Sequence, residues 1–224
     1  MGKKYTYDYP MPSVTVDLVI FRVFNGNLEV LLIQRKHPPY KDFFALPGGY
    51  VEQDEDLQDA AARELMEETN LKDVYLEQLY TFGAPDRDPR GRVISVAYFA
   101  LITSDKEIKA GDDAASASWI KVEVAECGKD VLAFDHGNIF RMALERLRNK
   151  IWYTPIAFKL VPNKFTIAQL KVVYEAILGE KLDWPNFRKR LMNRGLLKEA
   201  SGVAVGTGKK AHRPARLYML AKKG

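Results

Sequence analysis

Residues 49–71 read Gly-Tyr-Val-Glu-Gln-Asp-Glu-Asp-Leu-Gln-Asp-Ala-Ala-Ala-Arg-Glu-Leu-Met-Glu-Glu-Thr-Asn-Leu. Apolar residues recur at every fourth position within this segment, at Leu57, Ala61 and Leu65. That spacing is typical of the buried face of an α-helix, and it predicts a helix over residues 56–69. Glu64, Glu67 and Glu68 are three and four positions apart, so the helix places their carboxylates on one face.

Two interpretations of these glutamates are open. A run of glutamates on a helix is usually an acidic surface in contact with water. Three adjacent carboxylates repel one another, however, and a hard divalent cation such as Mg²⁺, which takes oxygen ligands, removes that repulsion. Gly48 and Gly49 precede the helix and let the backbone approach a bound group closely. The glutamates alone favour the acidic surface, whereas the wider pattern around them favours the metal site.

That wider pattern has a fixed spacing. Five residues separate Gly49 from Glu55, and seven more separate Glu55 from the run Arg-Glu-Leu-Met-Glu-Glu that begins at Arg63. This spacing resembles the Nudix box, Gly-x5-Glu-x7-Arg-Glu-apolar-x-Glu-Glu-x-Gly-apolar. The chain departs from it at Asn70, where the family has glycine. Asparagine is the next most tolerant residue for the left-handed conformation that ends a helix, so the departure is mild.

The resemblance implies a metal-dependent enzyme that hydrolyses a nucleoside diphosphate linked to a second moiety. It implies that Glu64, Glu67 and Glu68 bind Mg²⁺, with Mn²⁺ as an alternative, and that one of them activates the attacking water. Arg63 is expected to orient a glutamate, and Glu55 to support the metal shell or the start of the helix. Such cations polarise the pyrophosphate and neutralise its developing charge. The box does not identify the second moiety.

A second motif lies in the loop Asp-Arg-Asp-Pro-Arg-Gly-Arg over residues 86–92. Arginines beside a metal site can bind phosphates through paired N–H donors, although the same charges could pair among themselves on a surface turn. The predicted substrate-binding residues are Gly48, Gly49, Arg35, Arg87, Arg90 and Arg92. Residues 82–98 also resemble a Nudix branch with a C-terminal winged helix, whose members include ADP-ribose-sensing regulators of NAD metabolism and relatives that control sugar use.

The remaining segments predict a fold around these motifs. Residues 13–23 and 28–34 are rich in β-branched and apolar residues, and the turn dipeptide Asn25-Gly26 joins them into a hairpin. Further strands are predicted at residues 44–46, 50–51, 73–83, 92–103 and 119–120, and an amphipathic helix at residues 137–149. We expect an α+β protein in which an α/β/α Nudix sandwich over residues 1–150 precedes a smaller domain.

The charge changes sign near residue 150. Residues 1–150 contain 19 Lys and Arg against 25 Asp and Glu, whereas residues 151–224 contain 15 against 4. Residues 151–163 predict either a linker or a segment that packs on the next unit. After them, a capping-box pattern at Thr166 predicts one helix, Asp183 predicts a second, and two strands follow. This order predicts a winged helix-turn-helix over residues 151–224.

The positive charge of this last third predicts a polyanionic partner. In such domains the second helix enters the DNA major groove while the wing contacts the phosphate backbone, which supplies much of the affinity. Alternatives are an exposed basic surface or a contact with RNA or an acidic protein. The predicted DNA-binding residues are Arg188, Lys189, Arg190 and Arg194 on the helix, and Lys209, Lys210 and Arg213 on the wing.

Several protein classes are excluded. A single cysteine, Cys127, forms no disulfide framework, and the three histidines have no zinc-type spacing. No apolar run reaches the length of a membrane span, and the N-terminus lacks a signal peptide, so we expect a cytoplasmic protein with no membrane contact. His37, His136 and Cys127 are interpreted as surface or core residues rather than ligands.

These observations predict a ligand-responsive transcriptional regulator that binds, and with a complete box hydrolyses, ADP-ribose or a related nucleotide. A homodimer is expected, because one short recognition helix reads too few bases for useful specificity. The alternative is an Mg²⁺-dependent ADP-ribose pyrophosphatase in which the basic domain is an accessory. A weaker alternative is a Nudix enzyme that acts on RNA.

Overall fold

A mixed β-sheet forms the centre of the computed structural model, which describes residues 8–72, 74–103, 117–127, 132–204 and 215–221. The strand order is β3-β2-β1-β6-β5, with β4 paired to β1 and β7 paired to β2. Strands β1 and β6 run parallel, and the other pairs are antiparallel. The strands are β1 (Ser13–Phe24), β2 (Asn27–Gln34), β3 (Phe44–Ala45), β4 (Gly48–Tyr50), β5 (Tyr75–Phe82), β6 (Val93–Ile102) and β7 (Ala117–Lys121).

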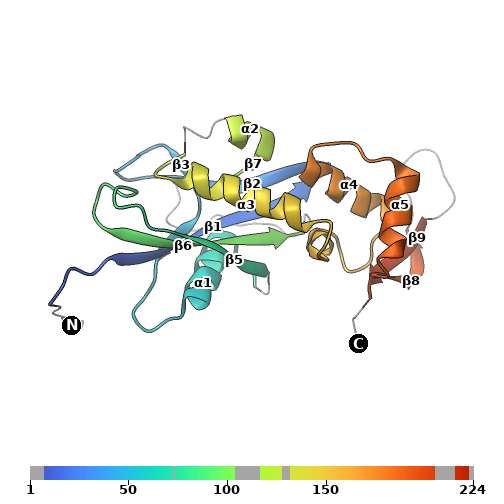
Figure 1. Cartoon of the computed structure of the whole chain (residues 1–224), viewed down its shortest axis with the longest axis horizontal. Coiled ribbons are helices and arrows are strands. Elements are labelled where there is room, and N and C mark those ends of the chain that lie inside the picture. Colours follow the sequence, from blue (N-terminus) through green and yellow to red (C-terminus); the bar gives the residue numbers. More distant parts are fainter. Residues whose placement is uncertain (1–7, 73, 104–116, 128–131, 205–214, 222–224) are drawn as a thin grey trace.

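Helices cover both faces of this sheet. Helix α1 (Leu57–Thr69) packs on one face and α3 (His136–Lys150) on the other, while the short α2 (Val122–Cys127) follows β7 (Figure 1). Alternate residues of β1 point to opposite faces, as the two-residue period of a strand requires. Leu18 and Ile20 therefore join the α1 core, whereas Val19 and Phe21 join the α3 core. This arrangement confirms the predicted α/β/α sandwich.

A winged helix-turn-helix follows the sandwich, as predicted. It contains α4 (Ile167–Leu178), α5 (Trp184–Asn193) and an antiparallel hairpin of β8 (Leu197–Ala204) and β9 (Ala215–Leu220). The capping box at the start of α4 is present: the Gln169 amide N–H donates to Thr166 Oγ1 at 3.1 Å, and the Thr166 amide N–H donates to Gln169 Oε1 at 2.7 Å. Asp183 caps α5 by accepting from the Asn186 amide N–H at 3.0 Å.

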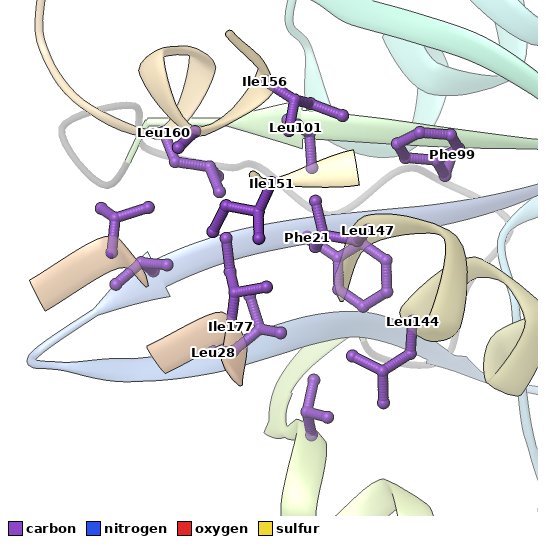
Figure 2. Packing of buried hydrophobic residues seen from close by; sticks show 14 of the residues in the cluster. Phe21, Leu28, Phe99, Leu101, Leu144, Leu147, Ile151, Ile156, Leu160 and Ile177 are labelled. Atoms are coloured by element: carbon purple, nitrogen blue, oxygen red, sulfur yellow. The ribbon is translucent and has the colours of Figure 1, made fainter. Parts of the chain in front are cut away.

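Residues 151–163 pack between the two units instead of forming a free linker. They contain a 3-10 helix, η2 (Ile156–Leu160), and the side chains of Ile151, Ile156 and Leu160 are buried. Figure 2 shows these side chains beside Phe21 of the sheet and Ile177 of α4. One continuous hydrophobic core therefore joins the sandwich to the winged helix. Trp152 and Phe158 pack in this region as expected, but Tyr153 is exposed.

Candidate functional site

Helix α1 carries the glutamates of the Nudix spacing and lies beside strand β4. The helix ends at Asn70, which takes the left-handed conformation (φ 55°, ψ 29°), and its amide N–H donates to the Met66 carbonyl at 2.7 Å. Asparagine thus performs the helix-ending role of the glycine in the Nudix pattern. The departure at this position leaves α1 and the position of its glutamates intact.

Glu64 and Glu68 are buried, at 8% and 9% exposure, whereas the side chain of Glu67 is 56% exposed. Arg63 lies between the acidic groups. It donates to Glu55 Oε1 at 2.7 Å and to Glu64 Oε1 at 2.8 Å, and it reaches Glu67 Oε2 at 3.5 Å. It also donates to the Tyr50 carbonyl of β4, which ties the helix to the sheet. Arg63 therefore sets the orientation of the glutamates around it.

The carboxyl group of Glu64 lies directly behind the glycines of β4. A Cβ atom added to Gly49 would be 2.1 Å from Glu64 Oε1, and one added to Gly48 would be 2.2 Å from the Val16 carbonyl oxygen. Backbone therefore excludes a side chain at Gly48, whereas a side chain at Gly49 would displace the Glu64 carboxyl group. Burial raises the pKa of Glu64, and the neighbouring Arg63 opposes that rise. Because burial disfavours the charged form of this carboxyl group, a cation bound beside it would stabilise the carboxylate.

The three glutamates do not form a cluster of ligands in this structure. Within the part of the chain that the structure describes, no three Asp, Glu, His or Cys side chains gather closely enough to hold a metal ion. The side chain of Glu67 is instead exposed and lies 3.5 Å from Arg63 Nη1, and the assignment of all three glutamates as metal ligands stays a prediction. The buried carboxyl groups of Glu64 and Glu68 supply oxygen atoms, which are the ligands that a hard divalent ion prefers. Gly49 lies against the Glu64 carboxyl group and leaves room for it.

A cavity of about 220 Å³ opens in front of the two glycines. Strands β1, β2 and β4, the loop after β5 and the residues before α3 form its walls. Three of the four predicted arginines line it, namely Arg35, Arg87 and Arg90. The fourth, Arg92, is not part of the lining: its side chain is exposed and donates to the Gly83 carbonyl at 2.7 Å. Its position past the turn accounts for this difference.

The cavity arginines already have acidic or carbonyl partners. Arg90 makes a paired interaction with Asp88, with Nη2 at 2.7 Å from Oδ2. Arg35 donates to the Pro39 carbonyl at 2.9 Å, and both Arg35 and Arg90 lie over the ring of Phe134, at 4.8 and 5.4 Å from its centroid. Within the loop of residues 86–92, Arg90 therefore pairs with a neighbouring loop residue while it still borders the cavity.

Arg87 belongs to a buried polar network that the sequence did not predict. Its guanidinium donates to Asp135 at 2.7 and 3.0 Å and to Asp17 Oδ2 at 3.3 Å, and its side chain is only 4% exposed. Ser95 Oγ also donates to Asp17, and His136 Nε2 lies 3.6 Å from Asp17 Oδ1. An aspartate inside the apolar strand β1 was the available signal, because buried carboxylates occur with partners.

His136 is a neutral member of this network, and it makes the stability of the fold depend on pH. Its Nδ1 accepts from the Leu46 amide N–H at 2.9 Å, and burial lowers its pKa. The unfolded chain therefore binds a proton near pH 6.5 that the folded chain does not, so stability falls as the pH drops below about 6.5. Replacing His136 with Asn keeps an acceptor for Leu46. We expect His136→Asn to reduce this slope by up to about 1.4 kcal/mol per pH unit.

Urea unfolding at several pH values between 5 and 8 measures this slope. The unmodified protein and His136→Asn are compared over the same range, so a uniform loss of stability in the variant does not affect the comparison. Equal slopes for the two proteins would contradict a buried neutral histidine.

One aromatic residue with a strained backbone, Phe134, lines the cavity, and a second, Tyr40, packs against it. Phe134 and Tyr40 both have positive φ values, of 55° and 59°, and their ring centroids are 4.9 Å apart. Phe43 lies 5.8 Å from Tyr40, and both residues are partly exposed. Bulky residues rarely adopt this backbone conformation, and such strain concentrates at functional sites. Sequence periodicity carries no information on these backbone angles, so this aromatic edge was not predicted.

The recognition helix α5 divides its basic residues between two surfaces. Arg188 and Lys189 are exposed and border a shallow groove with Trp184 and Met192. Arg190 instead lies over the Trp152 ring, at 3.6 Å from its centroid. The guanidinium of Arg194, also a predicted DNA contact, donates to the Ile151 and Thr154 carbonyls after α3 and to the Tyr174 hydroxyl of α4. The predicted wing contacts Lys209, Lys210 and Arg213 lie outside the described residues.

Comparison with known proteins places this geometry in a family. Residues 13–142 match the NUDIX domain. The chain belongs to the Nudix family. Residues 157–220 match the NrtR DNA-binding winged helix domain, so this Nudix protein carries both units that its residues predicted. Nudix hydrolases generally use divalent metal ions, in agreement with the oxygen-rich donor set of α1.

Relatives share this arrangement. The chain is 42% identical over 216 residues to the ADPR responsive transcriptional repressor NtrR of Acinetobacter baylyi, covering 96% of this chain and 84% of the relative. It is 42% identical over 139 residues to the ADP-ribose pyrophosphatase of Methanocaldococcus jannaschii, covering 62% of this chain and 76% of the relative.

The solved structures of Shewanella oneidensis NrtR are also similar. Its complex with a 27mer DNA superimposes with a TM-score of 0.78 at 32% identity, covering 93% of each chain. Its NUDIX domain complexed with ADP ribose gives 0.56 at 35% identity, covering 63% of this chain and 94% of that one. None of the helices in the described part of the chain is long and apolar enough to span a lipid bilayer.

Proposed function

We propose that this Nudix protein is an ADP-ribose-responsive transcriptional repressor. The observation that carries the proposal is the match to the A. baylyi repressor along nearly the whole chain, across both the Nudix and the winged helix units. The nucleotide binds in the cavity before Gly48 and Gly49, and DNA binds to the exposed face of α5. The protein acts in the cytoplasm, where its operator DNA and its nucleotide ligand are both present.

The cavity has the features that a dinucleotide-like ligand requires. Gly48 and Gly49 line the cavity, and the lack of a side chain at Gly49 lets the Glu64 carboxyl group lie against the β4 backbone at its edge. Arg35 and Arg90 face the same cavity and supply positive charge for the phosphates. The partly exposed ring of Phe134 offers a surface on which a purine base stacks. Arg87 acts indirectly, because it binds Asp17 in the cavity wall and Asp135, which lies between two residues of that wall.

Hydrolysis of ADP-ribose to AMP and ribose 5-phosphate is a second proposed activity of the same cavity. Its support is the complete set of Nudix glutamates and the similarity to an ADP-ribose pyrophosphatase. Glu64 and Glu68, joined by Glu67, would hold Mg²⁺ or Mn²⁺. The ion would polarise the pyrophosphate and lower the pKa of the attacking water. Arg63 keeps the Glu64 carboxylate pointed toward β4, so the chain positions this oxygen before the substrate binds.

DNA recognition is assigned to Arg188 and Lys189 of α5. Both side chains are exposed, and the helix that carries them corresponds to the recognition helix of a winged helix-turn-helix. We propose a homodimer, because two recognition helices read enough base pairs for operator specificity. Arg190 and Arg194 are left out of this surface, since both are engaged with the segment after α3.

Binding of the protein to the DNA upstream of its own gene tests the proposed function. Fluorescence anisotropy should show an operator complex whose affinity changes when ADP-ribose is added. We expect Arg188→Ala to weaken this complex by about 1–3 kcal/mol, which is roughly 5- to 150-fold. Lys121→Ala removes the same charge from an exposed position at the end of β7, outside the winged helix, and should have little effect. Binding that is independent of DNA sequence would count against a regulator.

A further inference from the structure

We infer that Arg194 is a positioning residue that fastens the recognition helix to the C-terminal end of α3, so that α3 transmits the state of the nucleotide cavity to the DNA-binding surface. This inference rests on the proposed function, and it adds the route by which one site affects the other. It assigns to Arg194 a contact within the protein instead of a contact with DNA.

The contacts of Arg194 define this attachment. Arg194 is the C-cap residue of α5, and its Nη2 donates to the Thr154 carbonyl at 2.8 Å. Its Nη1 donates to Tyr174 Oη at 2.9 Å and to the Ile151 carbonyl at 3.4 Å. Tyr174 Oη itself donates to the Ile151 carbonyl at 3.1 Å. One guanidinium thus joins α5, α4 and the end of α3.

The chemistry of a helix end explains why an arginine is placed there. Ile151 is the C-cap residue of α3, and the last carbonyls of a helix lack partners within the helix. These carbonyls carry the negative end of the helix dipole, which a cation stabilises. The fork of N–H donors in a guanidinium can bind several carbonyls at once, which an ammonium group cannot do in the same geometry.

Two further cations strengthen the same junction. Arg190, one turn before Arg194, lies 3.6 Å from the centroid of the Trp152 ring. Arg148, in the last turn of α3, donates through Nε to the Ile177 carbonyl of α4 at 3.1 Å. The side chains of Ile151 and Ile177 belong to one buried cluster beneath these polar contacts (Figure 2). These contacts attach the end of α3 to the helix-turn-helix.

The opposite end of α3 is attached to the nucleotide cavity. Asp135 precedes the first turn of α3, and Arg87, which lines the cavity, binds its carboxylate at 2.7 and 3.0 Å. Between the two ends, Ile139, Ala143 and Leu147 are completely buried. A helix of 15 residues is about 22 Å long. Figure 1 shows α3 extending along the sheet to α4 and α5. We therefore expect a ligand that displaces the Arg87–Asp135 pair to displace α3 and, through Arg194, the C-terminal end of α5.

The test measures coupling, not affinity alone. The ratio of DNA affinities with and without ADP-ribose is determined by anisotropy for the unmodified protein, Arg194→Gln and Arg188→Gln, and ADP-ribose affinity is determined by calorimetry. Coupling factors of about 5- to 150-fold are typical of allosteric proteins. We expect Arg194→Gln to bring this ratio to within about twofold of one, with ADP-ribose affinity of the free protein unchanged. Arg188→Gln should weaken DNA binding equally in both conditions and keep the ratio.

The outcomes separate the inference from the function on which it rests. If Arg194→Gln weakens DNA binding by the same factor with and without ADP-ribose, then Arg194 is a DNA contact or a structural residue and the inference is wrong. If the unmodified protein shows no effect of ADP-ribose on DNA binding, the proposed function itself fails. Arg194→Lys retains the charge and loses the fork, so it should give an intermediate ratio and provides a milder variant if Arg194→Gln unfolds.

Discussion

Glu64→Gln and Glu68→Gln are each expected to lower the rate of ADP-ribose hydrolysis by about 10²- to 10⁴-fold, the range that one positioned acid or base contributes. Each substitution keeps the size of the side chain and removes the negative charge of a buried carboxylate on α1. Glutamine at position 64 can still accept from Arg63, so the loss reports on charge rather than on folding. Separation of AMP from ADP-ribose by chromatography, with Mg²⁺ present, measures the rate.

Asp59→Asn is the matched control for these variants. Asp59 is an exposed acid in the first turn of the same helix, and its neutralisation should leave the rate unchanged. A rate in Glu64→Gln equal to that of the unmodified protein would rule out the assigned role of this carboxylate. An unmodified protein that releases no AMP would overturn the proposed hydrolysis, although ADP-ribose binding and the regulatory proposal would remain to be measured separately.

Arg87→Met is expected to lower the free energy of unfolding by about 3–5 kcal/mol, which is typical when one partner of a buried ion pair is removed. The substitution retains an apolar stem of similar length and leaves Asp17 and Asp135 without their shared cation. Both carboxylates are largely buried, with side-chain exposures of 10% and 18%. Urea unfolding at neutral pH measures the loss.

Arg216→Met provides the comparison for this prediction. Arg216 pairs with Glu199 at 2.8 Å, but both side chains are well exposed, at 71% and 63%. Exposed pairs contribute about 0–1 kcal/mol because water screens their charges. A loss in Arg87→Met no larger than that in Arg216→Met would mean that the buried network contributes little to the stability of the fold.

The elements of this protein were largely predictable from local sequence. The four-residue spacing of apolar residues predicted a helix over residues 56–69, and α1 begins one residue later and ends at the same residue. Thr166 and Asp183 marked the starts of α4 and α5, because a capping side chain acts within three residues along the chain. The Nudix spacing was visible as a resemblance to a family pattern, because its residues lie in one continuous segment from Gly49 of β4 to the end of α1.

The parts that were not predictable depend on residues brought together from distant segments. Arg87 and Asp17 are 70 residues apart, and Arg87 and Asp135 are 48 apart, so no local spacing connects them. The exposure of the Glu67 side chain depends on which carboxylates Arg63 contacts in the folded chain.

Periodicity, capping and composition therefore sufficed for the helices, the order of elements in the winged helix and the change of charge near residue 150. The Nudix box was identified by its resemblance to the spacing of the family. All of these depend on residues that are close together in the sequence. The assignment of Arg194 to the end of α3 needed the folded chain, because its partners are a tyrosine hydroxyl and backbone carbonyls of other elements. A carbonyl oxygen is present at every residue and leaves no mark in the sequence. Only packing of α3, α4 and α5 on one core leaves these particular carbonyls within reach of a cation.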